Sequence, residues 1–381
     1  MRVVVAPDSY KGSASALAVA EAMARGVGAV FPGAEVRLVP IADGGEGTVE
    51  ALVAATGGRI RHHDVHGPLG EPVRAHWGVL GDGETAVVEM AAASGLPLVP
   101  RDRRDPRLTS TRGTGELLLA ALDAGLSRLI VGIGGSATND GGAGMARALG
   151  ARFLDVAGAD LPEGGGALAR LARVDLSGLD PRLGAARVLV ACDVDNPLTG
   201  PRGASAVYGP QKGATPEMVR ELDAALDTFA RVVATATARD VASLPGAGAA
   251  GGLGAGLLFF TPATLRPGVE IVLEVTGFDA IVRAADLVIT GEGRTDRQTA
   301  MGKAPVGVAA AAKRHGVPVL CVSGGLGDGA DDVLAKGVDA VASAVPGPMP
   351  LEEAMARAPE LVERATARAC RLVKVGMGMR G

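Results

Sequence analysis

Both ends of the chain repeat one pattern: a short β-branched run, then a polar loop that contains glycine, then a segment with helical spacing. The predicted strands at the two ends are Val3–Ala6, Glu35–Pro40, Asp286–Thr290, Val317–Ser323 and Gly337–Ala342. The predicted helices that alternate with them are Ala14–Val30, Thr48–Thr56, Gly302–His315 and Leu351–Val373. Because strands that alternate with helices pair in parallel and are covered by those helices, the pattern predicts an α/β domain with a parallel sheet.

The middle of the chain follows a different order. Three predicted strands, Ile60–Val65, Val73–Val79 and Ala86–Met90, come without helices between them, which indicates an antiparallel or mixed sheet. Two more strands precede glycine-rich loops, and one long helix follows: Leu129–Ile133, Ala186–Ala191 and Thr215–Val241. We therefore predict two α/β domains, one parallel-sheet domain built from residues 1–58 and 278–381, and a mixed α/β domain inserted between them over residues 59–277.

Composition excludes several classes of protein. Among 381 residues, 48% are apolar, which predicts a sizeable buried core, and the net charge of −4 argues against a nucleic-acid partner. The three cysteines, Cys192, Cys321 and Cys370, lack metal-ligand spacing and are expected to be reduced thiols. The apolar run in MRVVVAPDS is too short for a signal peptide, and no run is long enough to span a membrane. We expect a soluble cytoplasmic protein.

Five loops that follow predicted strands share an unusual composition. They combine glycines with hydroxyls, acids and cations: APDSYKGS, PIADGGEGT, GGSATNDGGAG, CDVDNPLTGPRGA and GEGRTDRQTAMGKAP. Ligands bind beyond the carboxyl ends of parallel strands, and glycine lets backbone N–H groups approach an anion closely. Cations that can neutralise phosphate oxygens are Lys11, Lys212, Arg294 and Lys303. Acids that can hold Mg²⁺ or accept a proton are Asp43, Glu46, Asp193, Asp195, Glu292 and Asp296. Phosphoryl transfer needs this set of groups, so the loops predict a nucleotide-dependent kinase.

Any single motif in the sequence is less specific than the presence of five such loops together. A strict P-loop is absent, because Gly302 and Lys303 are followed by Ala304. The run Gly132–Ala137 loosely fits a dinucleotide loop and leaves an NAD(P)-dependent oxidoreductase open. His62, Asp64 and His66 would share one face of a strand; a metal site there is conceivable, but a solvent-facing strand surface is the favoured interpretation. A kinase for another small hydroxy acid and a metabolite-sensing regulator are two further functions that the loops leave open.

At these loops the sequence resembles the bacterial type-1 glycerate kinases. Seven blocks occur in order: APDSYKGSASA, PIADGGEGT, GIGGSATNDGGAGM, ACDVDNPLTGPRGA, YGPQKGA, GAAGGLG and ITGEGRTDRQTAMGKAP. Tyr10, Ala14 and Arg112 depart from the residues expected there. The resemblance implies ATP-dependent phosphorylation of D-glycerate with Mg²⁺, to 2-phosphoglycerate, in glyoxylate or sugar-acid breakdown. It also implies two α/β domains around a cleft, the first flavodoxin-like.

The resemblance suggests roles for the loop residues as hypotheses. Glycerate would bind to Asp8, Ser9, Lys11 and Arg294, and the catalytic groups would be Asp193, Lys11, Arg294 and Lys303. ATP phosphates would lie against Gly134, Gly135, Ser136, Thr138, Asn139, Asp140, Gly141 and Lys212. Mg²⁺ would be held by Asp43, Glu46 and Asp296. The oligomeric state, the nucleotide preference and the hydroxyl that is phosphorylated are left open.

Overall fold

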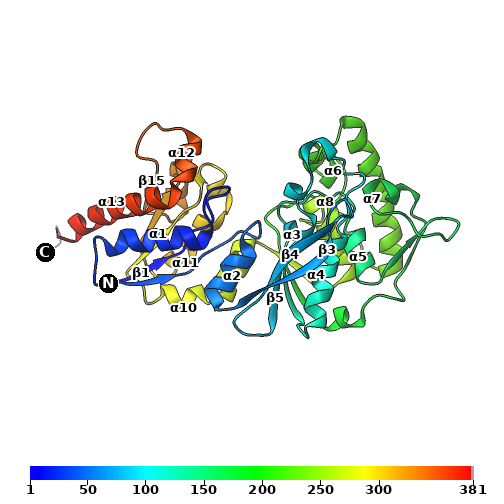
Figure 1. Cartoon of the computed structure of the whole chain (residues 1–381), viewed down its shortest axis with the longest axis horizontal. Helices are drawn as coiled ribbons and strands as arrows, with labels where there is room; N and C mark the ends of the chain where they lie inside the picture. The colour runs from blue at the N-terminus through cyan, green and yellow to red at the C-terminus, as the bar shows by residue number, and fades with distance from the viewer. Residues whose placement is uncertain (379–381) are drawn as a thin grey trace. The chain divides into compact units, whose positions relative to one another are not determined.

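The computed structural model describes residues 1–378, and the chain divides into two compact units (Figure 1). The first unit comprises Met1–Asp43, Glu50–Gly57 and the chain from Val269 onward; the second comprises Gly44–Val49 and Gly58–Gly268. Both ends of the chain thus belong to one unit. The borders at 58 and 278 stay a prediction of where the domains end.

The first unit is built on a parallel sheet of five strands. These are β1 (Arg2–Val5), β2 (Glu35–Leu38), β11 (Leu287–Thr290), β13 (Val319–Ser323) and β15 (Ala340–Ser343). Their order in the sheet is β15-β13-β11-β1-β2, and every neighbouring pair is parallel. Counted along the chain within this unit, the order is the 2-1-3-4-5 of flavodoxin-like folds, whose ligands bind where the winding direction reverses. That point lies between β1 and β11.

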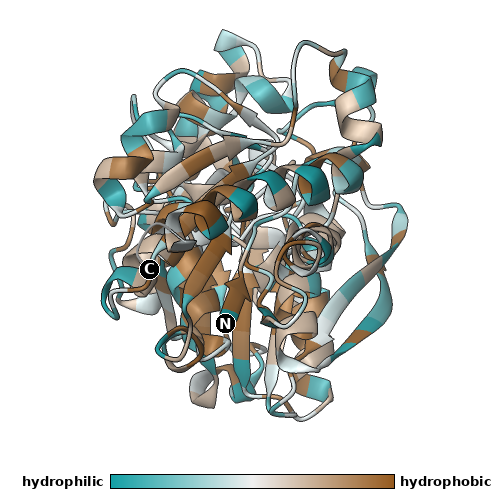
Figure 2. Cartoon of the chain, turned by 90° about the vertical axis from the view of Figure 1, so that its left-hand side faces the viewer, coloured by the Kyte–Doolittle hydropathy of each residue, from teal (hydrophilic) through white to brown (hydrophobic). Residues whose placement is uncertain are grey.

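Helices cover both faces of this sheet, as the three consecutive buried valines Val3–Val5 require. On one face, α1 (Ala16–Gly28) and α13 (Ala358–Gly378) pack against each other and share a core with β1 and β11. Elsewhere α11 (Ala304–Lys313) packs on β11 and β13. The strands form the brown interior of the unit in Figure 2. The remaining helices are α2 (Thr48–Thr56), α9 (Gly268–Val275), α10 (Phe278–Val282) and α12 (Leu351–Ala356).

The prediction of one helix over Leu351–Val373 is wrong. The segment forms two helices, α12 and α13, and the break lies at Arg357. Pro359 explains the break, because it has no backbone N–H to continue the hydrogen-bond ladder of α12. The carbonyl of Met355 instead accepts a hydrogen bond from Ser13 Oγ, at 2.9 Å.

The second unit contains a mixed sheet of six strands. These are β3 (Arg59–His66), β4 (Pro72–Val79), β5 (Thr85–Glu89), β6 (Arg128–Gly132), β9 (Arg187–Ala191) and β10 (Ala263–Arg266). The order is β10-β9-β6-β5-β4-β3; the β3/β4 and β4/β5 pairs are antiparallel, and the other pairs are parallel. The prediction of a mixed sheet in the middle of the chain is therefore confirmed.

Six α-helices and one short antiparallel pair of strands complete the described part of the second unit. The helices are α3 (Ala91–Ser94), α4 (Arg112–Asp123), α5 (Ala143–Ala148), α6 (Ala204–Tyr208), α7 (Pro216–Thr237) and α8 (Ala249–Phe260). The antiparallel pair β7 (Arg152–Leu154) and β8 (Arg173–Asp175) was not predicted from the sequence. The predicted helix Thr215–Val241 is α7; its Thr215 hydroxyl caps the first turn, and it ends before Ala238, whose φ is +54°.

Across residues 1–378, no helix combines the length and the apolar composition that crossing a bilayer requires.

Candidate active site

The loops after β1 and β11 begin side by side at the point where the winding of the first sheet reverses. Thr290 Oγ1 donates a hydrogen bond to the carbonyl of Ala6, at 2.8 Å, and Asp8 N donates to the carbonyl of Gly291, also at 2.8 Å. These bonds join the two segments that the sequence marked by APDSYKGS and GEGRTDRQTAMGKAP. The open α/β fold predicts a ligand site at this position.

Gly291, directly before Glu292, lies where the backbone packs tightly. A side chain at Gly291 would collide with the carbonyl oxygen of Val322. Gly324 N then donates to the carbonyl of Glu292, at 3.0 Å, and Gly325 N donates to that of Gly293, at 3.1 Å. These bonds lead into the short parallel pair of β12 (Arg294–Thr295) and β14 (Gly325–Leu326). The segment is therefore held to the loop after β13 as well as to β1.

The rest of this segment turns into α11. Thr299 Oγ1 donates to Glu292 Oε1, and Asp296 N donates to Thr299 Oγ1, at 3.0 Å. Gly302 has a φ of +115°, which an L side chain rarely adopts, and Lys303 is extended as the N-cap of the helix. The helix consequently begins at Ala304 rather than at Gly302, where the sequence predicted it.

A cavity of about 490 Å³ lies in the first unit beside these loops. One part of its lining is polar and combines residues of the segments that follow β1, β2 and β11. They are Asp8, Ser9, Lys11, Asp43, Glu292, Arg294, Asp296 and Lys303. The structure thus brings together every glycerate-binding residue predicted from the sequence, and also Lys303 and two of the three predicted metal ligands.

Each cation of this cavity faces an acid, but at a distance longer than a hydrogen bond. Lys11 Nζ is 4.0 Å from Asp43 Oδ2, Arg294 Nε is 3.8 Å from Asp296 Oδ2, and Lys303 Nζ is 3.9 Å from Glu292 Oε2. The side chains of Lys11 and Arg294 are 66% and 69% exposed. Ion pairs this long and this exposed contribute little to stability. Their cations can turn to an anionic ligand at small cost.

Two carboxyl groups of the cavity, Asp8 and Glu292, have raised pKa values. Burial raises the pKa of Asp8 to about 7, and the nearby carboxylate of Asp43 adds to this shift. Burial also raises the pKa of Glu292; Asp296 and Asp43 add to the shift, whereas the Thr299 hydrogen bond and Lys303 oppose it. Carboxylates that repel one another in a partly buried site favour a bound proton or a bound cation.

A second group of predicted residues lies in the second unit, in the loop after β6. Lys212 is 2% exposed, and its Nζ donates to Ser136 Oγ and to the carbonyl of Thr138, both at 2.7 Å. Burial lowers the pKa of Lys212 to about 7, against the opposing attraction of Asp140. A neutral amine has two N–H donors, and these two acceptors use both of them.

Most other polar groups of this loop are also hydrogen-bonded inside the protein. Asp140 Oδ2 accepts from Thr111 N and Thr111 Oγ1, each at 2.8 Å, and from Gly144 N, at 3.1 Å; burial raises its pKa. Asn139 Nδ2 donates to Ser205 Oγ, at 2.9 Å. We call this set the Lys212 cluster; its members are Ser136, Thr138, Asn139, Asp140 and Lys212.

Two buried oxygens of the Lys212 cluster have no hydrogen-bond partner within residues 1–378. They are Thr138 Oγ1 and Asn139 Oδ1. A buried oxygen without a hydrogen bond destabilises the protein, and a ligand that donates a hydrogen bond to it would remove this cost. These two atoms could therefore accept a hydrogen bond from a ligand.

Several backbone N–H groups of the same loop are engaged as well. Gly134 N donates to the carbonyl of Gly44, and Gly141 N donates to that of Gly251. Ala137 N, between them, donates to the carbonyl of Ser94. The predicted binding of ATP phosphates by Gly134, Gly135, Gly141 and the Lys212 cluster stays a prediction, and sequence reasoning did not anticipate how many of these groups have internal partners.

Asp193 and Glu46 belong to the second unit and are exposed. Asp193 Oδ1 accepts a hydrogen bond from Gly268 N, at 2.9 Å, where the chain leaves this unit. Among the described residues that line the 490 Å³ cavity, neither side chain occurs. Their predicted roles as base and metal ligand are therefore not connected by the structure to the first group, and they stay predictions.

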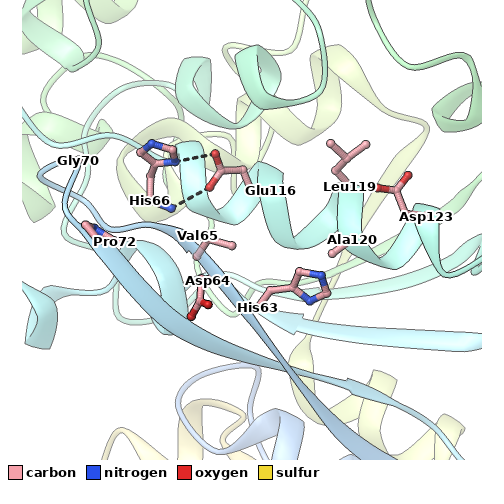
Figure 3. A pocket seen from close by; sticks show the side chains of 10 residues that line it. All are labelled: His63, Asp64, Val65, His66, Gly70, Pro72, Glu116, Leu119, Ala120 and Asp123. Carbon is pink, nitrogen blue, oxygen red and sulfur yellow. Dashed lines mark hydrogen bonds and ion pairs between the residues drawn. The ribbon is translucent and has the colours of Figure 1, made fainter.

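The histidine-rich strand β3 lies beside a different cavity, of about 360 Å³, in the second unit (Figure 3). In this view His66 points to Glu116 on α4: its Nδ1 lies 2.7 Å from Glu116 Oε1, and its backbone N donates to Oε2, at 2.8 Å. Arg112 Nε also contacts Glu116 Oε1, at 3.1 Å. His66 and Glu116 thus connect β3 to α4. Arg112, which departs from the residue expected in glycerate kinases, adds a further contact to Glu116.

Sequence reasoning missed the apolar part of the 490 Å³ cavity. It is formed by side chains of β14, α12, α13 and the segment that follows β15, namely Leu326, Val345, Leu351, Ala354, Met355 and Leu361, which we call the apolar wall. Two of its leucines are exposed, Leu326 at 42% and Leu351 at 73%. The only signal in the sequence was a pair of leucines directly after Gly325 and Pro350, at positions where turns usually carry polar residues.

The fold and the site define an α/β enzyme that acts on anionic substrates, with cations and acids gathered at the reversal point of a parallel sheet. The chain matches the model of the glycerate kinase family over residues 3–374. It belongs to the glycerate kinase family and is a kinase.

Close relatives match along almost the whole chain. A glycerate kinase of Bacillus subtilis (strain 168) is 58% identical over 368 residues, which cover 97% of this chain and 96% of that protein. A glycerate 2-kinase of Escherichia coli (strain K12) is 51% identical over 377 residues, or 99% of each chain. The crystal structure of a putative glycerate kinase 2 from Salmonella typhimurium LT2 is 52% identical, superimposes with a TM-score of 0.91 and covers 99% of both chains.

Proposed function

We propose that the protein transfers the γ-phosphoryl group of ATP to the 2-hydroxyl of D-glycerate with the help of Mg²⁺. The observation that carries the proposal is the cavity in which three cations and four acids meet at the reversal point of the first sheet. A relative 51% identical over 99% of the chain is named glycerate 2-kinase, which supports the 2-hydroxyl as the acceptor.

The cations take the anionic groups of the two substrates. Arg294 or Lys11 binds the carboxylate of glycerate, and Asp8 and Ser9 are the further glycerate-binding residues; all four line the cavity. Lys303 precedes the first turn of α11, whose N-terminus carries partial positive charge. A cation at that position stabilises the charge that develops on the transferring phosphoryl group.

The residues present fit a divalent cation. Oxygen ligands are what Mg²⁺ prefers, and the cavity gathers carboxylates of which two, Asp8 and Glu292, have raised pKa values. Asp43 and Asp296 would hold the ion, with Glu46 as the further predicted ligand. When bound, Mg²⁺ neutralises charge on the phosphates that are being separated.

The acceptor hydroxyl must lose its proton as it attacks. We propose Asp193 as the group that orients this hydroxyl and accepts the proton, while the bond between the γ-phosphorus and the ADP oxygen breaks. The hydrogen bond from Gly268 N to its Oδ1 restricts how this carboxylate can turn.

The proposal is tested by incubating the purified protein with Mg-ATP and D-glycerate and identifying the product by phosphorus NMR. A 2-phosphoglycerate signal is expected. A 3-phosphoglycerate signal would move the attack to the other hydroxyl. No phosphorylated product would contradict the proposal; ATP binding that remained intact would then point to another small hydroxy acid, and binding of NAD(P) without ATP turnover would point to an oxidoreductase.

A further inference from the structure

We propose that the apolar wall of the first unit's cavity binds the nucleoside part of the nucleotide co-substrate. This inference rests on the proposed function, because it assumes that a nucleoside triphosphate is a substrate. It assigns the base and ribose to the first unit, whereas the sequence placed the ATP phosphates on the loop after β6.

The size and chemistry of the cavity support this assignment. A cavity of about 490 Å³ is in the range of pockets that enclose ligands of nucleotide size, and it is much larger than a three-carbon acid needs. Glycerate consists almost entirely of a carboxylate and hydroxyl groups, so it gains nothing from an apolar surface. A nucleoside has a flat, weakly polar base, and its burial against aliphatic side chains is favourable.

The apolar wall has the exposure expected of an unfilled binding surface. Leu351 begins α12 with its side chain 73% exposed, and Leu326 in β14 is 42% exposed. Met355 and the small residues Ala354 and Ala358 line the same cavity. Thioether side chains adapt their shape to a bound ligand. Covering these side chains would remove apolar surface from water without displacing any internal packing.

The polar and apolar parts belong to one cavity, and its lining also includes glycine residues. Gly293, Gly324 and Gly325 line it, and a Cβ placed on Gly325 would meet no atom within 4 Å. The N–H groups of Gly324 and Gly325 are used by Glu292 and Gly293, so this strip is held in place. A ligand with an apolar head and an anionic tail matches a cavity that has an apolar wall at one part and Lys303 at the other, and Lys11 and Arg294 remain available for the carboxylate of glycerate.

Two variants of the lining test the proposal. Gly325→Leu places a side chain in open space of the cavity, at a backbone conformation that any residue adopts. Leu351→Glu puts a negative charge on the apolar wall. Matched controls are Gly33→Leu, where a Cβ also meets no atom within 4 Å, and Leu372→Glu on α13, where the leucine is 76% exposed; neither residue lines the cavity.

The readouts are the dissociation constant of a non-hydrolysable ATP analogue with Mg²⁺ and the separate KM values for ATP and glycerate. Both lining variants are expected to raise the dissociation constant and the KM for ATP by about 10-fold or more, a loss of about 1.4 kcal/mol. The KM for glycerate at saturating ATP should stay within about twofold for both lining variants, and the controls should match the wild type in all three constants.

Two results would overturn the inference. A rise in the KM for glycerate with unchanged nucleotide constants would assign the apolar wall to the acid substrate, and unchanged constants in both variants, with melting temperatures of the wild type, would leave it without a ligand role. Analogue binding does not depend on turnover. Weaker analogue binding by the lining variants, in a protein that does not phosphorylate glycerate, would therefore support the nucleoside site while rejecting the proposed acceptor.

Discussion

Each of the two units holds a polar cluster built from the same residue types. The two clusters differ in how far their cations are buried and in how close these cations lie to their partners. In the first unit Lys11, Arg294 and Lys303 stand 3.8 to 4.0 Å from their acids, and two of these cations are mostly exposed. In the second unit Lys212 is 2% exposed and makes two hydrogen bonds of 2.7 Å. The same residue types therefore occur once in an open, partly solvated cluster and once in a buried cluster with internal hydrogen bonds.

This contrast indicates which cluster has polar groups that are available to bind a ligand. Inside the Lys212 cluster, most donors and acceptors are paired with partners in the protein, which holds the loop after β6 in one conformation. Around the first unit's cavity, charges are partly solvated; burial raises the pKa values of Asp8 and Glu292, and neighbouring carboxylates add to both shifts. We infer that ligands complete the first cluster, while the second is largely complete as it stands.

The largest expected effect belongs to Lys303. If it stabilises charge on the transferring phosphoryl group, Lys303→Met should lower kcat by about 10²- to 10³-fold with little change in melting temperature. Lys336→Met, an exposed lysine that does not line the cavity, is the matched control. Steady-state kinetics with Mg-ATP and glycerate measure the effect; a kcat within about threefold of the wild type would remove Lys303 from this role.

The next effect concerns Asp193, which lies in the second unit. Asp193→Asn should lower kcat by about 10²-fold if the carboxylate accepts the proton of the attacking hydroxyl. Asp195→Asn is the control, since Asp195 is exposed and pairs with Arg202 at 2.9 Å. A kcat near the wild-type value would show that the catalytic chemistry does not use this acid and would confine the catalytic groups to the first unit.

A smaller effect is expected for Arg294. Arg294→Ala should raise the KM for glycerate by about 10-fold and change kcat less, if the guanidinium binds the carboxylate. Arg297→Ala is the matched control, because Arg297 is equally exposed and stands 3.9 Å from Asp332. If only the KM for ATP rises, Arg294 contacts the nucleotide and glycerate binds to Lys11 instead.

The last expected effect is on stability rather than on kinetics, and it concerns Lys212. Its pKa is about 7 in the folded protein and about 10.4 in an unfolded chain, so between these values only the unfolded chain binds the proton. The free energy of unfolding should therefore rise with pH in this window, by up to about 1.4 kcal/mol per unit, relative to Lys212→Met.

Urea unfolding of both proteins at several pH values measures this difference. Below about pH 7 the two slopes should coincide, because Lys212 is protonated in both states there. Parallel curves from about pH 7 to 10 would mean that Lys212 is charged in the folded protein, and the Lys212 cluster would then have a positive charge to offer to a phosphate.

The first cluster could be predicted from the sequence because the order of the strands alone brings its residues together. Loops that follow neighbouring parallel strands must meet at one edge of the sheet, so Asp8, Lys11, Arg294 and Lys303 come together whatever their side-chain conformations. The mixed sheet of the second unit was equally readable, since Ile60–Met90 offers strands without intervening helices.

The apolar wall and the internal pairing of the Lys212 cluster were not predictable in the same way. The apolar wall depends on Pro359, which separates α12 from α13, and on long-range packing of these helices beside β14 and β15. The Lys212 cluster depends on partners distant in the chain, such as Thr111 for Asp140 and Ser205 for Asn139. No local pattern of residues specifies either arrangement.

Hydrogen exchange of backbone amides, with and without a non-hydrolysable ATP analogue and Mg²⁺, tests the contrast between the two clusters most directly. Slower exchange is expected in residues 7–15, 291–303 and 324–327, with no change in residues 134–142. Protection confined to residues 134–142, with none in the loops after β1 and β11, would contradict the account and would assign the nucleotide to the Lys212 cluster.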